Sequence, residues 1–210
     1  MSPRPPRRAG AASGVGEASC AKRGVVLRVP RLRPDNTLVM VIDMQERLQP
    51  LIADDARVRK QAAALAEGAR LLGVPVFVTE QYPKGLGHTV PELRSAVDAA
   101  GGVYEKSSFS CAADESIAAR ITAAARPNVV LAGVEAHICV LQTALDLTEA
   151  GYSVFLAEDA VGSRTKENKE IGIARARRHG AEPANVEMVL FELMGTKEHP
   201  QFKAVQALIK

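Results

Sequence analysis

Aromatic side chains are scarce in this chain. Tryptophan is absent, and the three aromatic residue types together make up 4% of the 210 residues. Hydrophobic residues still make up 47%, which is enough for a folded core and argues against global disorder. The core must therefore be built from alanine, valine, leucine and isoleucine. The length suggests a single domain.

Cysteine is also sparse. The chain has three cysteines, Cys20, Cys111 and Cys139, and no CxxC pair. An odd number of cysteines cannot form a closed set of disulfides, and the spacing does not match a zinc site. Free thiols of this kind suit a reducing compartment, so we expect a cytoplasmic protein with a thiol that is free to react.

Long apolar runs are missing. No stretch of about 18 apolar residues occurs, so we expect no membrane span and no membrane partner. The first residues also lack the apolar segment of a secretory signal.

The positive charge is concentrated at one end. Residues 1–34 hold eight lysines and arginines against one acidic residue, which gives +7. Since the whole chain carries +3, the remainder carries −4. A mildly acidic body argues against nucleic acid as a partner.

Residues 1–34 also contain many prolines and glycines. We expect a disordered basic extension, or a misassigned start, ahead of a folded domain at 35–210. Because the segment is rich in arginine and poor in acids, a mitochondrial transit role is one alternative. A functional basic arm is another.

Apolar runs alternate with segments of helical periodicity along the body. Buried strands are predicted where β-branched and apolar residues run together, at 37–42, 74–79 and 128–132. Further strands are predicted at 103–106, which is short, and at 152–157 and 186–191. Helices are predicted at 55–72, 114–125, 138–150, 167–179 and 200–210. Residues 80–93 contain two prolines and two glycines, which favour a loop.

This alternation predicts an α/β fold with three layers, in which helices cover both faces of a mostly parallel, six-stranded, Rossmann-like sheet. Ligands of such sheets bind beyond the carboxyl ends of the strands. Asp43, Glu80, Lys106 and the turn at 133–139 all lie at or just after such ends. We therefore expect these residues to meet around one site.

Asp43 closes a buried apolar strand. An unpaired buried carboxylate is costly, so it needs a cation or hydrogen-bond donors. Asp43 is a candidate general base, although it would also suit the N-cap of the next segment. Lys106 ends a short strand on the same side, where it would favour the ionised forms of a nearby carboxylate and thiol. Taken alone, Lys106 reads as an ordinary surface lysine.

Cys139 lies in the first turn of a helix that follows a buried strand. Backbone N–H groups and the positive end of the helix dipole point toward this position, and both stabilise a thiolate or an oxyanion. A cysteine in a helix is also commonly a small buried hydrophobe. Together the three residues are a stronger candidate for an active site than any one of them alone, because the fold is expected to bring three strand ends to one point.

Three motifs resemble the isochorismatase-like hydrolase superfamily: VIDMQ at 41–45, YEKSSFS at 104–110 and AGVEAHICV at 132–140. The resemblance covers about residues 36–209. The segments at 79–93 and 199–210 are similar to isochorismatase domain-containing proteins, a branch of uncertain substrate.

The resemblance implies an Asp-Lys-Cys triad of Asp43, Lys106 and Cys139. It also implies a cis peptide between Val134 and Glu135, and an oxyanion hole made by the amides of Glu135 and Cys139. A homo-oligomer is implied as well, and no cofactor is expected.

Polar residues of the neighbouring loops suggest a small polar ligand. We expect substrate contacts from Gln45, Glu80, Gln81 and Tyr82. Nicotinamidases of this superfamily carry an Asp-x-His metal motif where this chain has Glu80-Gln81-Tyr82. Glu80 and His88 are possible ligands, but we expect no metal.

True isochorismatases are similar through residues 136–138 but carry glycine where this chain has Cys139. Cys139 therefore favours hydrolysis of an amide or related acyl group. His137 precedes Cys139 by two positions, and side chains at this spacing on a helix point apart, so His137 is a poor base for the thiol. Cys20 and Cys111 have no such context, and we expect both to be structural or incidental.

These observations predict a cysteine hydrolase that cleaves a small amide, carbamoyl or related acyl substrate through a thioester intermediate. Two alternatives are open. One is non-covalent hydrolysis led by Asp43, as in isochorismatases. The other is a catalytically silent, oligomeric binding protein.

Overall fold

The computed structural model describes residues 30–93 and 102–210. Its strands are β1 (Thr37–Ile42), β2 (Val76–Gln81), β3 (Val103–Lys106), β4 (Asn128–Val134), β5 (Ser153–Gly162) and β6 (Glu182–Ala184). The main helices are α1 (Asp55–Leu71), α2 (Pro83–Leu86), α4 (Glu115–Ala124), α5 (Cys139–Glu149), α6 (Lys166–Arg178), α7 (Val186–Met194) and α8 (Phe202–Leu208). A short 3-10 helix, η1, spans Gln49–Leu51.

Within the described residues the strands form one six-stranded sheet in the order β3-β2-β1-β4-β5-β6, and every neighbouring pair is parallel. β1 lies in the middle, where its residues pair with β2 on one side and β4 on the other. This confirms the predicted α/β class and the six-stranded parallel sheet. It also brings the carboxyl ends of β1, β2, β3 and β4 to the same edge.

Successive residues of β1 point to opposite faces of the sheet, and both faces are covered. Leu38, Met40 and Ile42 belong to one hydrophobic cluster, whereas Val39 and Val41 belong to the other. All are fully buried. This double burial explains why the strand is a continuous apolar run in the sequence.

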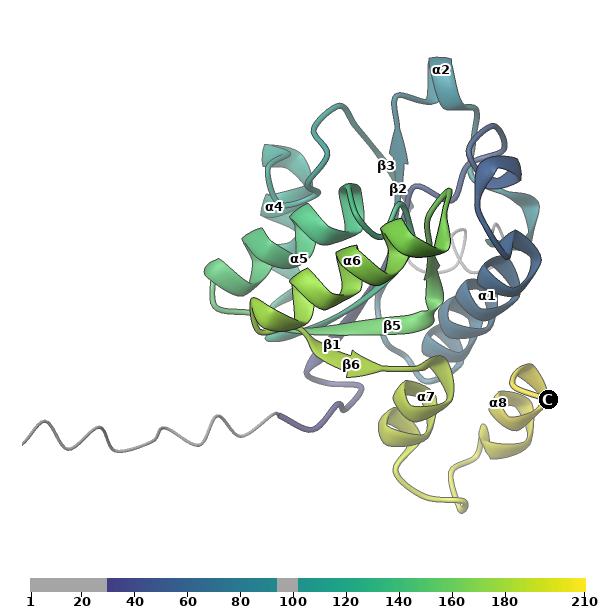
Figure 1. Ribbon diagram of the computed structural model, residues 1–210. Coiled ribbons are helices and arrows are strands. Elements are labelled where there is room, and N and C mark those ends of the chain that lie inside the picture. Colours follow the sequence, from purple (N-terminus) through teal and green to yellow (C-terminus); the bar gives the residue numbers. More distant parts are fainter. Residues whose placement is uncertain (1–29, 94–101) are drawn as a thin grey trace, which may run out of the picture.

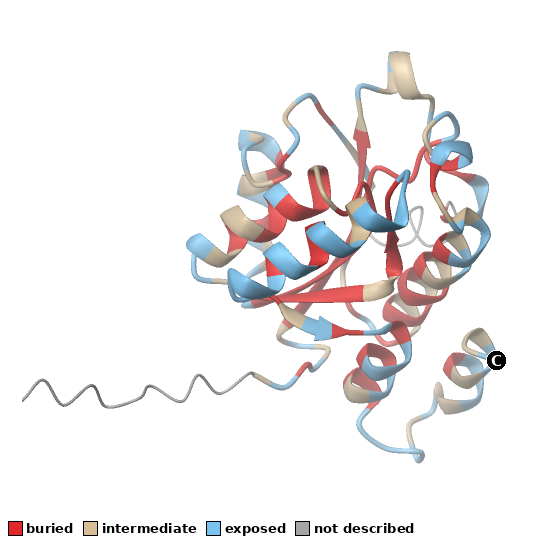
Figure 2. Ribbon diagram, viewed as in Figure 1, coloured by how far each residue is buried: buried red, intermediate tan, exposed pale blue. Residues whose placement is uncertain are grey.

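The helices form two outer layers. The cluster with Val39 and Val41 includes side chains of α1, α7 and α8, and the cluster with Leu38 includes those of α4, α5 and α6. Figure 1 shows α4, α5 and α6 on one side of the sheet and α1 on the other. Figure 2 shows that the helices are red toward the sheet and pale blue away from it. The hydrophobic core is therefore divided in two, with one cluster on each face of the sheet beneath the helices that cover it.

The predicted strand at 186–191 is wrong. These residues begin helix α7, and the sixth strand is the preceding Glu182–Ala184. The buried residues of α7 have helical spacing: Val186, Val189, Leu190, Leu193 and Met194. Asn185 caps the helix, since its Oδ1 accepts the N–H of Met188 at 2.8 Å. The short β6 tolerates Pro183 because it lies at the sheet edge.

The predicted boundary at residue 34 also needs correction. Residues 1–29 of the expected extension lie outside the described part. Leu32 is 1% exposed in the core, and its N–H donates to Glu192 Oε1 at 2.9 Å. The packed body therefore already includes residue 32.

Among the residues described, none of the helices combines the length and apolar character needed to cross a bilayer.

Candidate active site

Asp43 follows the last residue of β1, at the carboxyl edge of the sheet. Its φ of 53° is in the left-handed region, which aspartate tolerates better than most residues. Its N–H donates to the carbonyl of Thr79 at 3.1 Å, and its Oδ1 accepts the Thr79 hydroxyl at 2.7 Å. Two strand ends therefore hold this fully buried carboxylate in one orientation.

Lys106 is the last residue of β3, and its ammonium group meets the same carboxylate. Its Nζ donates to Asp43 Oδ2 at 2.7 Å and to Gln81 Oε1 at 2.7 Å. It also donates to the carbonyls of Ser108 and Phe109 at 3.2 and 3.1 Å. The side chain is 0% exposed, so Lys106 is not a surface lysine.

The charge of Lys106 is held by its surroundings. Burial by itself would lower the pKa of the ammonium group, but the negative charge of Asp43 and the hydrogen bond to it outweigh burial and raise that pKa above its ordinary value. The group therefore stays an ammonium ion at neutral pH.

Cys139, the first residue of α5, completes the cluster from the other side of β1. It is 7% exposed, and it lines the same small cavity as Asp43. The structure thus brings together the three residues predicted to form a triad. Asp43 is ion-paired with Lys106 and shares a cavity with Cys139.

The thiol of Cys139 is not pre-ionised. Burial, and then the negative charge of Asp43, raise its pKa to about 12, and the positive charge of Lys106 offsets only part of this. Lys106 does lower the pKa of this thiol, as the sequence predicted, but burial and Asp43 outweigh it. The sequence could not reveal how strongly burial acts on this thiol.

Two glycines make the turn before Cys139 possible. Gly133 has φ of 111°, and a Cβ there would lie 2.1 Å from the carbonyl oxygen of Ile42. A Cβ on Gly172 of α6 would lie 2.7 Å from the carbonyl oxygen of Ala136. β4 therefore approaches the end of β1, and α6 approaches the turn, more closely than any side chain would permit.

The Val134–Glu135 peptide, directly after this close contact, is cis. The turn then leads into α5, with the N–H of Ile138 and that of Val140 bonded to the carbonyl of Glu135. In contrast, the N–H groups of Glu135 and Cys139 have no acceptor in the described part of the chain. Both are therefore free for a ligand.

Sequence reasoning missed a cluster around the Glu135 side chain. Arg164 Nε lies 3.0 Å from Glu135 Oε1, and the Arg164 N–H donates to Oε2 at 3.2 Å. His137 Nδ1 lies 3.7 Å from the same carboxylate and 3.0 Å from the hydroxyl of Ser163. His137 is thus part of this cluster, whereas the sequence predicted only that it would be a poor base for Cys139.

Two of the expected substrate contacts serve the backbone. Gln45 is 0% exposed; its Oε1 accepts the N–H of Gln81, and its Nε2 donates to the carbonyls of Gln81 and Gly87. Glu80 is 4% exposed, and its Oε1 accepts both the N–H and the hydroxyl of Thr89 at 2.6 and 2.7 Å. Both residues fasten the 82–90 loop to β2.

The other two expected contacts differ from each other. Gln81 lines the small cavity beside Cys139, but its amide is already bonded to Lys106 and to the carbonyl of Ser107. Tyr82 is 60% exposed and lines a separate surface hollow with Lys84 and Asp114.

Glu80 and His88 were possible metal ligands, and His88 Nδ1 lies 3.1 Å from Glu80 Oε2. Across residues 30–93 and 102–210, no group of three or more histidine, cysteine, aspartate or glutamate side chains is arranged to hold a metal ion. The absence of a metal stays a prediction.

A cavity of about 120 Å³ opens beside Cys139, and its walls come from the ends of β1, β2 and β4 and from the loops beyond them. Its lining consists of Asp43, Leu48, Gln81, Leu86, Phe109, Glu135, Ile138 and Cys139. A substrate in this cavity would touch both the thiol and the carboxylate.

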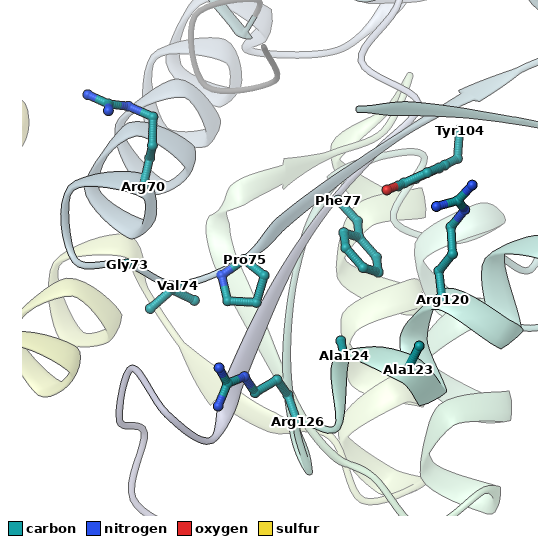
Figure 3. Close-up of a pocket in the computed structure, with 10 residues that line it drawn as sticks. All are labelled: Arg70, Gly73, Val74, Pro75, Phe77, Tyr104, Arg120, Ala123, Ala124 and Arg126. Carbon is teal, nitrogen blue, oxygen red and sulfur yellow. The ribbon is translucent and has the colours of Figure 1, made fainter. Parts of the chain in front are cut away.

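A larger hollow of about 720 Å³ lies at the other end of the sheet, near Pro75, which precedes β2. Figure 3 shows its aromatic wall of Phe77 and Tyr104, with the guanidinium group of Arg120 over the Tyr104 ring. Its lining contains no carboxylate, thiol or imidazole. The hollow is far from the residues that could perform hydrolysis.

The chain matches the model of the isochorismatase domain over residues 37–188. It is 41% identical over 181 residues to isochorismatase domain-containing protein 1 of Salmo salar. That match covers 85% of this chain and 62% of the relative, so this chain spans less than two thirds of the relative's length.

Two solved structures have the same fold. One, described as the MAR1 ribonuclease of Caenorhabditis elegans, has a TM-score of 0.80 and 37% identity, over 86% of this chain and 92% of that one. The other is YcaC from Pseudomonas aeruginosa with hexane-2,5-diol and covalent acrylamide, with a TM-score of 0.81 and 25% identity over 86% and 92% of the chains.

The α/β architecture and the family match together define a protein of the isochorismatase-like class. This chain belongs to the isochorismatase family, as the sequence motifs predicted.

Proposed function

We propose that this protein is a cysteine hydrolase that cleaves a small amide, carbamoyl or related acyl compound. The observation that carries the proposal is the position of Asp43, whose carboxylate lines the same cavity as the thiol of Cys139 and is ion-paired with the ammonium group of Lys106. A nucleophile, a proton acceptor and a fixed positive charge then line or adjoin one cavity.

The raised pKa of Cys139 fits a nucleophile that is deprotonated only during attack. Asp43 accepts the thiol proton as the sulfur bonds to the carbonyl carbon. The carbonyl oxygen becomes an oxyanion, and the N–H groups of Glu135 and Cys139 are the donors that would stabilise it. Lys106 keeps its charge throughout and holds the carboxylate in position.

When the tetrahedral intermediate collapses, the C–N bond breaks and the amine leaves with the proton from Asp43. A thioester to Cys139 remains. Asp43 then accepts a proton from an attacking water molecule, the C–S bond breaks, and the proton returns to the sulfur. The products are a carboxylic acid and an amine or ammonia.

The covalent acrylamide in the Pseudomonas structure supports a site of this size, since acrylamide is a three-carbon amide. The word ribonuclease in the Caenorhabditis structure's name describes that protein. For this chain, a net charge of −4 outside residues 1–34 and a cavity of about 120 Å³ do not favour a polynucleotide substrate.

The test is a screen for ammonia release from small amides, ureas and carbamoyl compounds, with the Cys139→Ala protein as the blank. Turnover should fall by at least about 1,000-fold in the variant, and a rapidly quenched reaction should show the acyl group on Cys139 by mass spectrometry. Folding of the variant is checked by its thermal melting curve.

Full activity of Cys139→Ala on a confirmed substrate would exclude covalent catalysis by this thiol. If isochorismate is the substrate, and Asp43→Asn loses activity while Cys139→Ala keeps it, the non-covalent reaction is favoured. If no compound is turned over and Asp43→Asn changes only the stability of the protein, the protein is a silent binding protein.

A further inference from the structure

The cavity beside Cys139 has an apolar wall. Four of its lining residues are Leu48, Leu86, Phe109 and Ile138. Phe109 is 55% exposed, and the other three are partly buried. Exposed large hydrophobic side chains around a concave site are typical of ligand contacts.

The polar side chains of the lining already have partners. Both oxygens of Asp43 are bonded, one to Thr79 and one to Lys106. The amide of Gln81 is bonded at both ends.

The same holds for Glu135, whose carboxylate is paired with Arg164. The free donors at this site are therefore the two backbone N–H groups of Glu135 and Cys139, which suit the oxygen of the reacting carbonyl.

A polar group elsewhere on the acyl part of a substrate would lose its water without gaining a partner. Leaving a buried polar group unpaired costs about 1–3 kcal/mol, which corresponds to roughly 5- to 150-fold in binding. Each methylene buried instead contributes about 0.8 kcal/mol, or about fourfold.

The volume limits the length of the acyl part. An apolar cavity of about 150 Å³ in another protein accommodates benzene, which has six carbon atoms. A cavity of about 120 Å³ therefore holds about four or five carbon atoms.

We propose that the substrate's acyl part is a short hydrocarbon chain of about three to five carbon atoms, counting the carbonyl, with no polar substituent. This inference rests on the proposed cysteine hydrolase function. It replaces the sequence-based expectation of a small polar ligand, because Gln45, Glu80 and Tyr82 are absent from the cavity lining.

The test compares primary amides of increasing length, from formamide to octanamide, by ammonia release. We expect kcat/KM to rise about fourfold per methylene up to four or five carbons and to fall for longer chains. Butyramide should exceed 3-hydroxypropionamide, which has the same size, by about tenfold or more. A flat series, or a preference for the hydroxyl compound or for succinamate, overturns the inference while the hydrolase function stands.

Two variants test whether Phe109 forms the wall that sets the preferred length of the amide. Phe109→Ala should move the optimum to longer amides, because it removes one wall of the cavity. Met188→Ala is the matched control, since Met188 is also an exposed large hydrophobe, 54% exposed, but lies on α7 away from the cavity. An optimum that moves equally in both variants, or in neither, contradicts the assigned wall.

Binding separates this inference from the proposed function. In Cys139→Ser, which keeps the size of the side chain, saturation-transfer NMR can rank butyramide against 3-hydroxypropionamide without turnover. If the wild type hydrolyses no amide but this variant prefers butyramide, the hydrolase proposal fails and the apolar site is retained. If the variant prefers the hydroxyl compound, the apolar site is refuted.

Discussion

The ammonium group of Lys106 and the carboxylate of Asp43 form an ion pair of 2.7 Å in which both side chains are 0% exposed. The two residues are 63 positions apart in the chain. They meet because β1 and β3 end at the same edge of a parallel sheet, with β2 between them.

Breaking this pair should destabilise the fold. We expect Lys106→Met to lower the free energy of unfolding by about 3–5 kcal/mol, because Asp43 would be left as an uncompensated buried charge. The Asp43→Asn/Lys106→Met double variant should lose clearly less than the sum of the two single variants, since it leaves no lone charge. Urea unfolding at neutral pH measures all four proteins, and strictly additive losses would contradict a direct pair.

The high pKa of Cys139 makes a prediction about alkylation. Because the thiolate is the reactive form, labelling of Cys139 by iodoacetamide should be slow at pH 7 and rise about tenfold per pH unit up to pH 10. Asp43→Asn should shift this profile to lower pH, because Asp43 raises the pKa. Site-resolved mass spectrometry follows the reaction, and a plateau in the wild type with a midpoint below pH 8 would show a pre-formed thiolate.

The same pKa affects stability at high pH. The folded state holds the Cys139 proton up to about pH 12, whereas the unfolded chain releases it near the ordinary value of about 9. The unfolded state therefore binds fewer protons between these values, so the free energy of unfolding should fall as pH rises above 9. Cys139→Ala should show a shallower fall between pH 9 and 10.5 in urea unfolding. If the free energy of unfolding falls equally steeply with pH in the wild type and in Cys139→Ala, the raised pKa of Cys139 is refuted.

Gly133 should not tolerate even a methyl group. Gly133→Ala would place Cβ 2.1 Å from the backbone oxygen of Ile42, which cannot move aside without disturbing the sheet. We expect loss of soluble protein or a fall in stability above about 3 kcal/mol. Gly73→Ala is the control, because Gly73 also has a positive φ, 72°, but has open space around it. This control should lose only about 1 kcal/mol. If Gly133→Ala and Gly73→Ala lower the melting temperature equally, the positive φ alone accounts for the loss of stability, and the close contact with Ile42 does not contribute.

Arg164 should matter for the site more than its exposure suggests. Arg164→Gln leaves the carboxylate of Glu135 buried with weaker partners, so we expect about 1–2 kcal/mol lower stability and at least tenfold lower kcat on any confirmed substrate. Arg177→Gln is the matched control, since Arg177 of α6 pairs with Glu158 of β5, which is more exposed than Glu135. That variant should change neither quantity measurably. A normal kcat in Arg164→Gln would show that catalysis does not depend on Arg164 holding the carboxylate of Glu135 in place.

The sequence by itself determined the parallel sheet and the meeting of Asp43, Lys106 and Cys139 at one edge. Buried parallel strands are continuous apolar runs, and the ends of such strands converge whatever their side chains are. It also contained the helical spacing of Val186, Val189 and Leu190, although β-branched residues in that run favoured a strand. Gly133 was a visible signal too, since a glycine inside a strand often marks a close backbone approach.

Only the tertiary structure decided what the site is like inside. The pKa of Cys139 depends on burial and on Asp43 and Lys106 at once, and these contributions come from three distant segments. Gln45 and Glu80 look like substrate contacts in the sequence, yet the fold uses their side chains to hold backbone. The apolar cavity wall likewise draws on separate loops. Desolvation and hydrogen-bond partners are set by what packs around a group, and motif spacing carries no information about that.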